Sequence, residues 1–324
     1  MRRRAWVETS GGTLEFETFA GLLAASCWAT GSYLFSRMDA PAMALNLGKN
    51  IVAGTLLVIS LPFAGLGLEV WLDATVRDFT WLFLSGIVGI MIGDSAYFRS
   101  IQILGPRRAL VLTTLTPPVS ALLGWFWLAE VLESGQLLAI LVTLVGIFLV
   151  IRDQDLASDR AQWRAGKPVD GIILGIVAAL CQATGIALSK VVMQSSLGAL
   201  EVSAVRIGTA VVGGVVFAAC TGQLGSWLKP LRRWDLFPVL FVASAIGTYF
   251  GIWLSHISVD AVSLAIATTQ MSMTPVFMVL IVAIALRKKI APLALGGILL
   301  AVAGVALLMM PEGASRWLDQ VFGL

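Results

Sequence analysis

Charged side chains are scarce in this sequence. Only 13% of its 324 residues are Asp, Glu, Lys or Arg, with 22 basic and 19 acidic residues and a formal net charge of +3. Ordinary soluble domains carry about twice that share. A water-exposed surface on a chain of this length needs many more charges, so a soluble globular protein is excluded. Hydrophobic residues make up 58% of the chain, which excludes intrinsic disorder.

Histidine and cysteine are also rare, with one and three residues respectively. A single histidine, His256, excludes paired-histidine metal sites such as HExxH. No P-loop, GxGxxG or GxSxG motif stands out, so we expect no cofactor and no metal. The basic residues form no continuous stripe, and nucleic acid is therefore not an expected partner. The cysteines lie inside apolar stretches, where buried thiols are expected: Cys27, Cys181 and Cys220.

Long apolar runs are what the sequence has in abundance. The mean hydropathy is +0.90, and a membrane-spanning helix needs about 20 apolar residues. Runs such as LLAILVTLVGIFLVI are continuously apolar, whereas the strands of a membrane β-barrel alternate in polarity. The sequence therefore predicts an all-α polytopic membrane protein with ten transmembrane helices. The predicted spans are Thr18–Phe35, Met43–Phe63, Phe79–Ile101, Ala109–Leu128, Leu137–Ile151, Val169–Val192, Val202–Cys220, Leu236–Leu254, Val262–Leu286 and Leu293–Met309.

One long hydrophilic insert separates these spans into two groups of five. The predicted organisation is an N-terminal tail (1–17), a first five-helix repeat (18–151), a polar linker (152–168), a second five-helix repeat (169–310) and a C-terminal tail (311–324).

The two groups of helices repeat each other in sequence. Residues 21–34, GLLAASCWATGSYL, align with residues 175–188, GIVAALCQATGIAL, at an offset of 154. Later matches keep a similar offset: Lys49 with Arg206 and Pro118 with Pro275 at 157, and Gly146 with Gly304 at 158. This indicates a tandem duplication. Because five is odd, the second copy is expected to cross the membrane in the opposite sense, as in the inverted repeats of secondary transporters.

These motifs resemble EamA-type members of the drug/metabolite transporter superfamily. The matching marks are the CWATG segment of the first span, the cations Lys49 and Arg206, the run PPVSALLGWFWLAE ending at Glu130, and the glycine-containing LLAILVTLVG. The second copy carries Arg287 where Glu130 would repeat. The resemblance implies a ten-helix basket that moves metabolites, amino acids or drugs. We expect its cavity between the first, third, fourth, sixth, eighth and ninth helices.

Basic residues are distributed unequally between the two sides of the predicted membrane. The connections after the odd-numbered helices hold 14 of the 22, and the opposite side holds five. The positive-inside rule then places both termini outside the cytoplasm. The family resemblance implies the opposite orientation.

Ionisable residues inside membrane spans are costly and are functional candidates by default. Asp94 is the carboxylate deepest in a span, and it fits either a proton-coupling or cation-binding role or a structural ion pair with Lys49 or Arg99. Lys49 and Arg206 fit either the binding of anionic groups or snorkelling to the interface. For Lys190 and His256, both at predicted helix ends, snorkelling and surface exposure respectively are favoured.

Polar and aromatic residues supply further candidates for a substrate site. Trp28 and Gln182 are repeat partners, as are Thr113 and Gln270, and symmetric positions near a pseudo-two-fold axis can contact one substrate from both sides. Aromatic rings suited to stacking or cation–π contacts add to this set, although packing or an interfacial belt is the favoured explanation for any one ring. These rings are Tyr97, Tyr249 and Trp253.

The duplicated architecture predicts a secondary active transporter working by alternating access, coupled to protons or driven by exchange. The expected substrate is a small molecule: an amino acid, an amine, a related polar or aromatic solute, or a drug. The expected location is the cell membrane, either plasma or bacterial inner membrane, crossed many times in contact with the lipid bilayer. A membrane-embedded enzyme and a channel are the alternatives. The sequence leaves open whether the protein is a monomer or a dimer.

Overall fold

The computed structural model describes residues 16–66, 71, 74–104, 106–152, 167–194, 197–287 and 289–309. Within these ranges the chain is helical and contains no strand. Most of the predicted N-terminal tail, polar linker and C-terminal tail lies outside the described residues. Helix α7 ends at Arg152 and helix α8 begins at Pro168, on either side of the predicted linker.

Sixteen α-helices and two π-helical segments are described. In the first half they are α1 (Phe16–Phe35), α2 (Ala42–Phe63), α3 (Val76–Ser85), η3 (Gly86–Ile92), α4 (Gly93–Leu104), α5 (Pro106–Thr113), α6 (Thr116–Leu128) and α7 (Ser134–Arg152). In the second half they are α8 (Pro168–Met193), α9 (Ala199–Cys220), α10 (Leu224–Trp227), α11 (Lys229–Arg232), α12 (Phe237–Ser244), η4 (Ala245–Phe250), α13 (Gly251–Ala261), α14 (Leu264–Met271), α15 (Thr274–Leu286) and α16 (Pro292–Leu308).

Eight helical stretches in the described residues are long and apolar enough to cross a membrane. Their outward faces expose large apolar side chains such as Phe63 and Phe126, which are 88% and 81% exposed. Exposed apolar area on this scale is typical of a surface in contact with lipid. The chain is thus a multi-pass membrane protein.

The eighth membrane span is longer than the sequence predicts. The predicted end is Leu254, but α13 continues to Ala261. The polar residues Ser255, His256 and Ser258 follow the predicted end, and all three are buried. His256 contacts Arg206 and Ser258 contacts Gln270, so the helix continues inside the bundle.

Two predicted spans are interrupted immediately before a proline. The predicted fourth span divides into α5 and α6 at Thr114–Leu115, and the ninth divides into α14 and α15 at Ser272–Met273. Pro117 and Pro275 are the second residues of the helices that follow, where proline fits because the first turn of a helix needs no amide donor.

These interruptions correct the register of the repeat. Both helix breaks, and the left-handed residues Ala129 and Arg287 that end α6 and α15, lie 158 residues apart. The counterpart of Pro275 is therefore Pro117 and not Pro118. Likewise Arg287 corresponds to Ala129 and not to Glu130. Thr113 and Gln270, the predicted repeat partners, are 157 residues apart. They are therefore one residue out of register with the observed offset of 158.

The two π-helical segments lie at matching places in the two halves. η3 joins α3 to α4, and η4 joins α12 to α13, with an offset of 158 to 159 residues. A π-helix inserts an extra residue per turn and is frequent at functional sites. Here η3 comes just before Asp94 and Tyr97, and η4 contains Tyr249 and comes just before Trp253.

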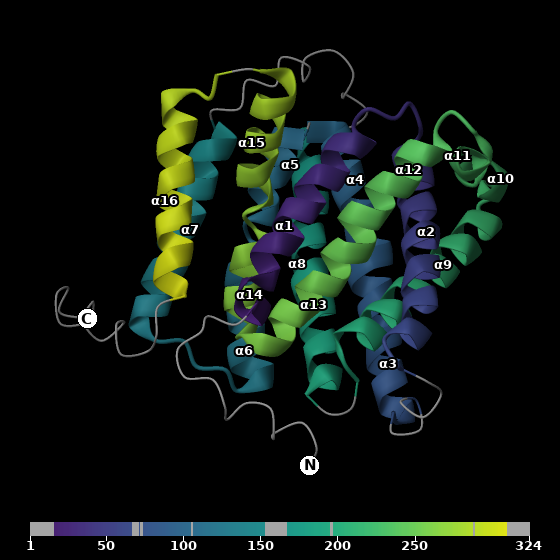
Figure 1. The fold of residues 1–324 in the computed structure, drawn as a ribbon, viewed down its shortest axis with the longest axis horizontal. Coiled ribbons are helices and arrows are strands. Elements are labelled where there is room, and N and C mark those ends of the chain that lie inside the picture. Colours follow the sequence, from purple (N-terminus) through teal and green to yellow (C-terminus); the bar gives the residue numbers. More distant parts are fainter. Residues whose placement is uncertain are drawn as a thin grey trace.

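The first helix of each half packs mainly against the other half (Figure 1). α1 contacts α12, η4, α13, α14 and α15, while α8 contacts α3, η3, α4, α5 and α6. The contacts are close because glycines meet. A Cβ added at Gly31 would lie 2.6 Å from Gly247 Cα, and one added at Gly185 would lie 2.6 Å from Gly89 Cα. Small residues at such crossings let helix backbones approach each other.

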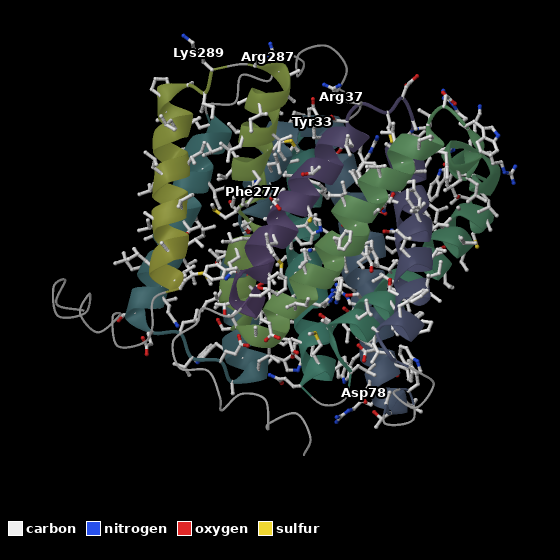
Figure 2. The ribbon with its side chains drawn as sticks, viewed as in Figure 1. Tyr33, Arg37, Asp78, Phe277, Arg287 and Lys289 are labelled. Atoms are coloured by element: carbon white, nitrogen blue, oxygen red, sulfur yellow. The ribbon has the colours of Figure 1, made fainter. Side chains whose placement is uncertain are left out.

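The two ends of the bundle can be told apart by labelled residues. Figure 2 places Arg37, Arg287 and Lys289 at one end and Asp78 at the opposite end. Asp78 forms a capping box with Thr75 at the start of α3, which explains its burial near a helix end.

Candidate functional site

An ion pair joins Lys49 of α2 to Asp94 of α4 inside the bundle. Lys49 Nζ lies 3.0 Å from Asp94 Oδ2 and also donates to Asn50 Oδ1 at 3.0 Å. Asn50 Nδ2 in turn lies 3.3 Å from Asn46 Oδ1. The Lys49 side chain is 11% exposed, so it is buried in the bundle and does not snorkel to the interface. Of the two interpretations of Asp94, the pair with Lys49 is the arrangement observed.

A second polar group surrounds Arg206 of α9. Its Nη1 lies 2.6 Å from His256 Nε2, and His256 Nδ1 lies 2.8 Å from Ser203 Oγ and 2.9 Å from the Ile252 carbonyl oxygen. Arg206 is 3% and His256 1% exposed. The expectation that His256 lies on the surface is therefore wrong, and Arg206 does not snorkel.

The two polar groups are linked electrostatically through Asp94. Asp94 acts on Arg206 as well as on Tyr97, which lies one turn further along α4. The Arg206 guanidinium also lies against η3, because a Cβ added at Gly89 would be 2.9 Å from its Nη2. Its Nε–H is buried and has no hydrogen-bond partner in the described part of the chain.

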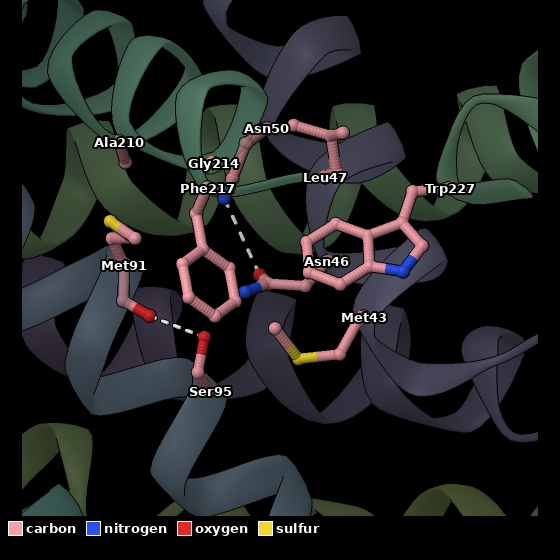
Figure 3. Close-up of a pocket in the computed structure, with 10 residues that line it drawn as sticks. All are labelled: Met43, Asn46, Leu47, Asn50, Met91, Ser95, Ala210, Gly214, Phe217 and Trp227. Atoms are coloured by element: carbon pink, nitrogen blue, oxygen red, sulfur yellow. Dashed lines mark hydrogen bonds between the residues drawn. The ribbon is translucent and has the colours of Figure 1, made fainter. Parts of the chain in front are cut away.

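A small pocket lies beside the Lys49–Asp94 pair (Figure 3). It is lined by α2, η3, α4, α9 and α10, and it combines the polar side chains of Asn46, Asn50 and Ser95 with apolar and aromatic ones. Within this pocket, Ser95 donates to the carbonyl oxygen of Met91, four residues earlier on the same helical stretch. This pocket differs from the cavity expected from the sequence, which was placed between the first, third, fourth, sixth, eighth and ninth helices.

A third charged cluster lies at the end of the bundle where α6 stops and α14 starts. Glu130 Oε1 lies 2.6 Å from Lys190 Nζ, which also donates to the Val262 carbonyl oxygen at 2.6 Å. Glu130 Oε2 accepts the Leu264 backbone N–H at 2.7 Å. The prediction that Lys190 snorkels is wrong: its side chain is 8% exposed and is held in an ion pair between the two halves.

Two of the polar candidates have hydrogen bonds within the protein. Gln270 is fully buried; its Nε2 donates to the Thr18 carbonyl oxygen at 2.9 Å, and its Oε1 accepts from Ser258 at 3.2 Å. These bonds join α14 to α1 and α13. Thr113 donates to the Leu110 carbonyl oxygen within its own helix.

The aromatic candidates divide between two regions. The Trp28 ring lies on Gly251, where an added Cβ would be 2.5 Å away, and Gln182 is half-buried on α8. Tyr249 and Trp253 pack together, with ring centroids 6.1 Å apart, and the Tyr249 hydroxyl lies 2.8 Å from Ser60 Oγ. These two rings pack against a core cluster that includes Ile90 of η3 and Ala204 and Ile207 of α9. Ala204 and Ile207 flank Arg206 in sequence.

Sequence reasoning missed several polar residues of these clusters. Asn46 and Asn50 flank Lys49 on α2, and Ser203 lies one turn before Arg206 on α9. Polar residues three or four positions from a charge share its helix face, and that spacing is the available signal for Asn46 and Ser203. Asn50 is adjacent to Lys49 and has no such signal. The pairing of Glu130 with Lys190 had no sequence signal, because the two residues are 60 positions apart and belong to different repeats.

The fold and these buried clusters define a multi-pass helical membrane protein with charged groups in its interior. A family model described as the EamA-like transporter family matches residues 16–152 and 169–310. The chain belongs to this family, whose members are transporters.

Comparison with solved structures supports the same fold. One crystal structure of a protein matches with a TM-score of 0.74, covering 94% of this chain and 98% of its own, at 17% sequence identity. That likeness establishes the fold alone. A comparison with curated protein sequences finds no match.

Proposed function

We propose that this protein is a secondary active transporter that moves a small polar solute across the cell membrane by alternating access. The observation that carries the proposal is the charged set inside the bundle: the buried cations Lys49 and Arg206 and the partly buried Asp94, contributed by both halves. Ionised groups inside membrane spans are expensive and mark substrate or ion pathways. A protein that served only as a scaffold would not need them.

The proposed architecture is ten spans in two inverted halves, with α1 and α16 added to the eight long apolar stretches. Figure 1 supports this, since α1 and α8 run in opposite directions through the bundle. The matching helix breaks, left-handed residues and π-helical segments give further support. In inverted-repeat transporters the two halves rock about a site between them.

The proposed coupling group is Asp94. It faces Lys49 from α2 and Arg206 from α9, with Tyr97 on its own helix, and Cys181 of α8 lies next to the adjacent Gly93. Protonation of Asp94 would remove the negative charge that neutralises Lys49. Binding of a proton therefore changes the charge of the site, as coupling requires.

Uptake into proteoliposomes tests this function. We expect Asp94→Asn to abolish uptake driven by a pH gradient while solute exchange continues, because the amide cannot take up the proton. Asp39→Asn, at an exposed carboxylate, is the matched control and is expected to behave like the wild type. An unchanged response to the pH gradient in Asp94→Asn would contradict the proposed coupling, and discrete single-channel conductance would contradict alternating access.

A further inference from the structure

The two repeat-related cations Lys49 and Arg206 have partners of different charge. Lys49 is neutralised by Asp94 at 3.0 Å. Arg206 instead contacts His256, and in the described residues it forms no ion pair. The second half therefore lacks the internal counter-ion that the first half has.

The histidine beside Arg206 is neutral. A guanidinium has only donors and keeps its charge in proteins. His256 Nε2, 2.6 Å from Arg206 Nη1, must accept and so cannot carry a proton. The ring proton is then on Nδ1, facing Ser203 and the Ile252 carbonyl. His256 orients Arg206 but does not neutralise it. Asp94 acts on Arg206 as well but is held in the ion pair with Lys49, so one carboxylate serves two buried cations. One positive charge is left over, and a buried charge without a counter-ion is unfavourable.

One edge of the Arg206 guanidinium is suited to an incoming anion. Nη1 is occupied by His256, whereas the buried Nε–H has no partner in the described residues. Nε and Nη2 form a planar edge that can donate two parallel hydrogen bonds to a carboxylate. Nη2 lies against Gly89, where any side chain would come within 2.9 Å of it. The absence of a side chain at Gly89 gives the guanidinium the room to lie against η3.

We propose that Arg206 is the anchor of a binding site for a monocarboxylate with an apolar or aromatic body. With Lys49 and Arg206 positive, Asp94 negative and His256 neutral, the cluster has one excess positive charge, which a single carboxylate balances. Tyr249 and Trp253 lie about two turns and one turn before His256, which contacts Arg206, and they pack against the core cluster that contains Ala204 and Ile207. They supply aromatic surface for the body of the ligand. The inference names the substrate class of the transporter proposed above and rests on that function.

Thermal melting of the purified protein in detergent tests the site, because a ligand that binds the folded state raises the melting temperature. The probes are phenylacetate, formate, phenylacetamide, phenethylamine and phenyl phosphate. We expect phenylacetate to stabilise most and formate less, with no stabilisation by the amide or the amine. Equal stabilisation by the amide or amine, tighter binding of phenyl phosphate, or no binding of either carboxylate would overturn the proposal.

Three variants identify the anchor. Arg206→Lys keeps the charge but loses the two-bond edge, and we expect phenylacetate affinity to fall about tenfold or more. Arg37→Lys makes the same change at an exposed arginine and should leave the affinity unchanged. Asp94→Asn removes the competing internal anion and should strengthen phenylacetate binding several-fold.

The change in phenylacetate affinity caused by Asp94→Asn tests the proposal even if Arg206→Lys does not fold. Weaker phenylacetate binding by Asp94→Asn, or unchanged binding by a folded Arg206→Lys, would overturn it. Binding and transport are measured separately. Carboxylate binding without flux in liposomes would support the Arg206 site but contradict the transport function. Flux of an amine without carboxylate binding would support transport but contradict the Arg206 site.

Discussion

Glu130 and Lys190 show how single residues tie the two halves together. Each Glu130 oxygen has its own donor, one from Lys190 Nζ and one from the Leu264 backbone. The carboxylate thus also caps the N-terminus of α14, where the helix dipole favours negative charge. With both charges mostly buried, neither group can be solvated if its partner is lost.

We expect Glu130→Gln and Lys190→Met each to reduce the free energy of unfolding by about 3 kcal/mol, because each leaves a buried charge without its counter-ion. The double variant should lose less than the sum of the two, since it leaves no unpaired charge. Thermal melting in detergent measures all three. Additive losses would show that the two residues act independently.

The sequence gives a partial account of these residues. It identified Lys49, Asp94 and Arg206 because a charge inside an apolar run is visible in one dimension. It misjudged Lys190 and His256 because position near a helix end does not say whether a neighbouring helix covers that end. Burial of both residues depends on contacts between helices far apart in the chain.

At the scale of helices, the close crossings depend on glycine at both partners. Gly31 meets Gly247 in η4, and Gly185 meets Gly89 in η3, so the repeated ATG string contacts a π-helical segment in each case. Periodicity and proline predict where helices run and where α6 and α15 begin. They do not predict η3 and η4, because a π-helix is stabilised by packing around it and has no pattern of its own in these residues.

We expect Gly31→Ala to lower the free energy of unfolding by about 1 to 3 kcal/mol, because the new Cβ would lie 2.6 Å from the Gly247 backbone, which must then move. Gly208→Ala is the matched control on α9, where nothing lies within 4 Å of an added Cβ. There alanine should be neutral or stabilising through its helix propensity. Equal melting temperatures for the two variants would contradict the tight crossing.

At the scale of the whole molecule, the basic residues Arg37, Arg287 and Lys289 gather at one end of the bundle (Figure 2). The positive-inside rule assigns the end with more basic residues to the cytoplasm. Charge counting and family resemblance predict opposite orientations. The orientation depends on how many basic residues the connecting segments carry on each side of the membrane and not on any single site.

We expect Arg77→Cys to react with a membrane-impermeant maleimide on intact cells and Arg37→Cys to react only after permeabilisation. Both positions are exposed. Arg77 precedes Asp78 in the first turn of α3, and Asp78 lies at the end of the bundle opposite Arg37 (Figure 2). The background variant has Cys27, Cys181 and Cys220 replaced by alanine. The reverse labelling pattern would place both termini in the cytoplasm.

The exchange of first helices between the halves has a consequence for how the chain assembles. α1 finds its partners only after the second half has been made, and α8 packs on helices made long before it. Each half, expressed alone, would leave the packing surface of its own first helix without its main partners, even though it carries a complete copy of the sequence repeat. We therefore expect the two halves, expressed as separate chains, to function only when they are produced together and associate as two subunits do.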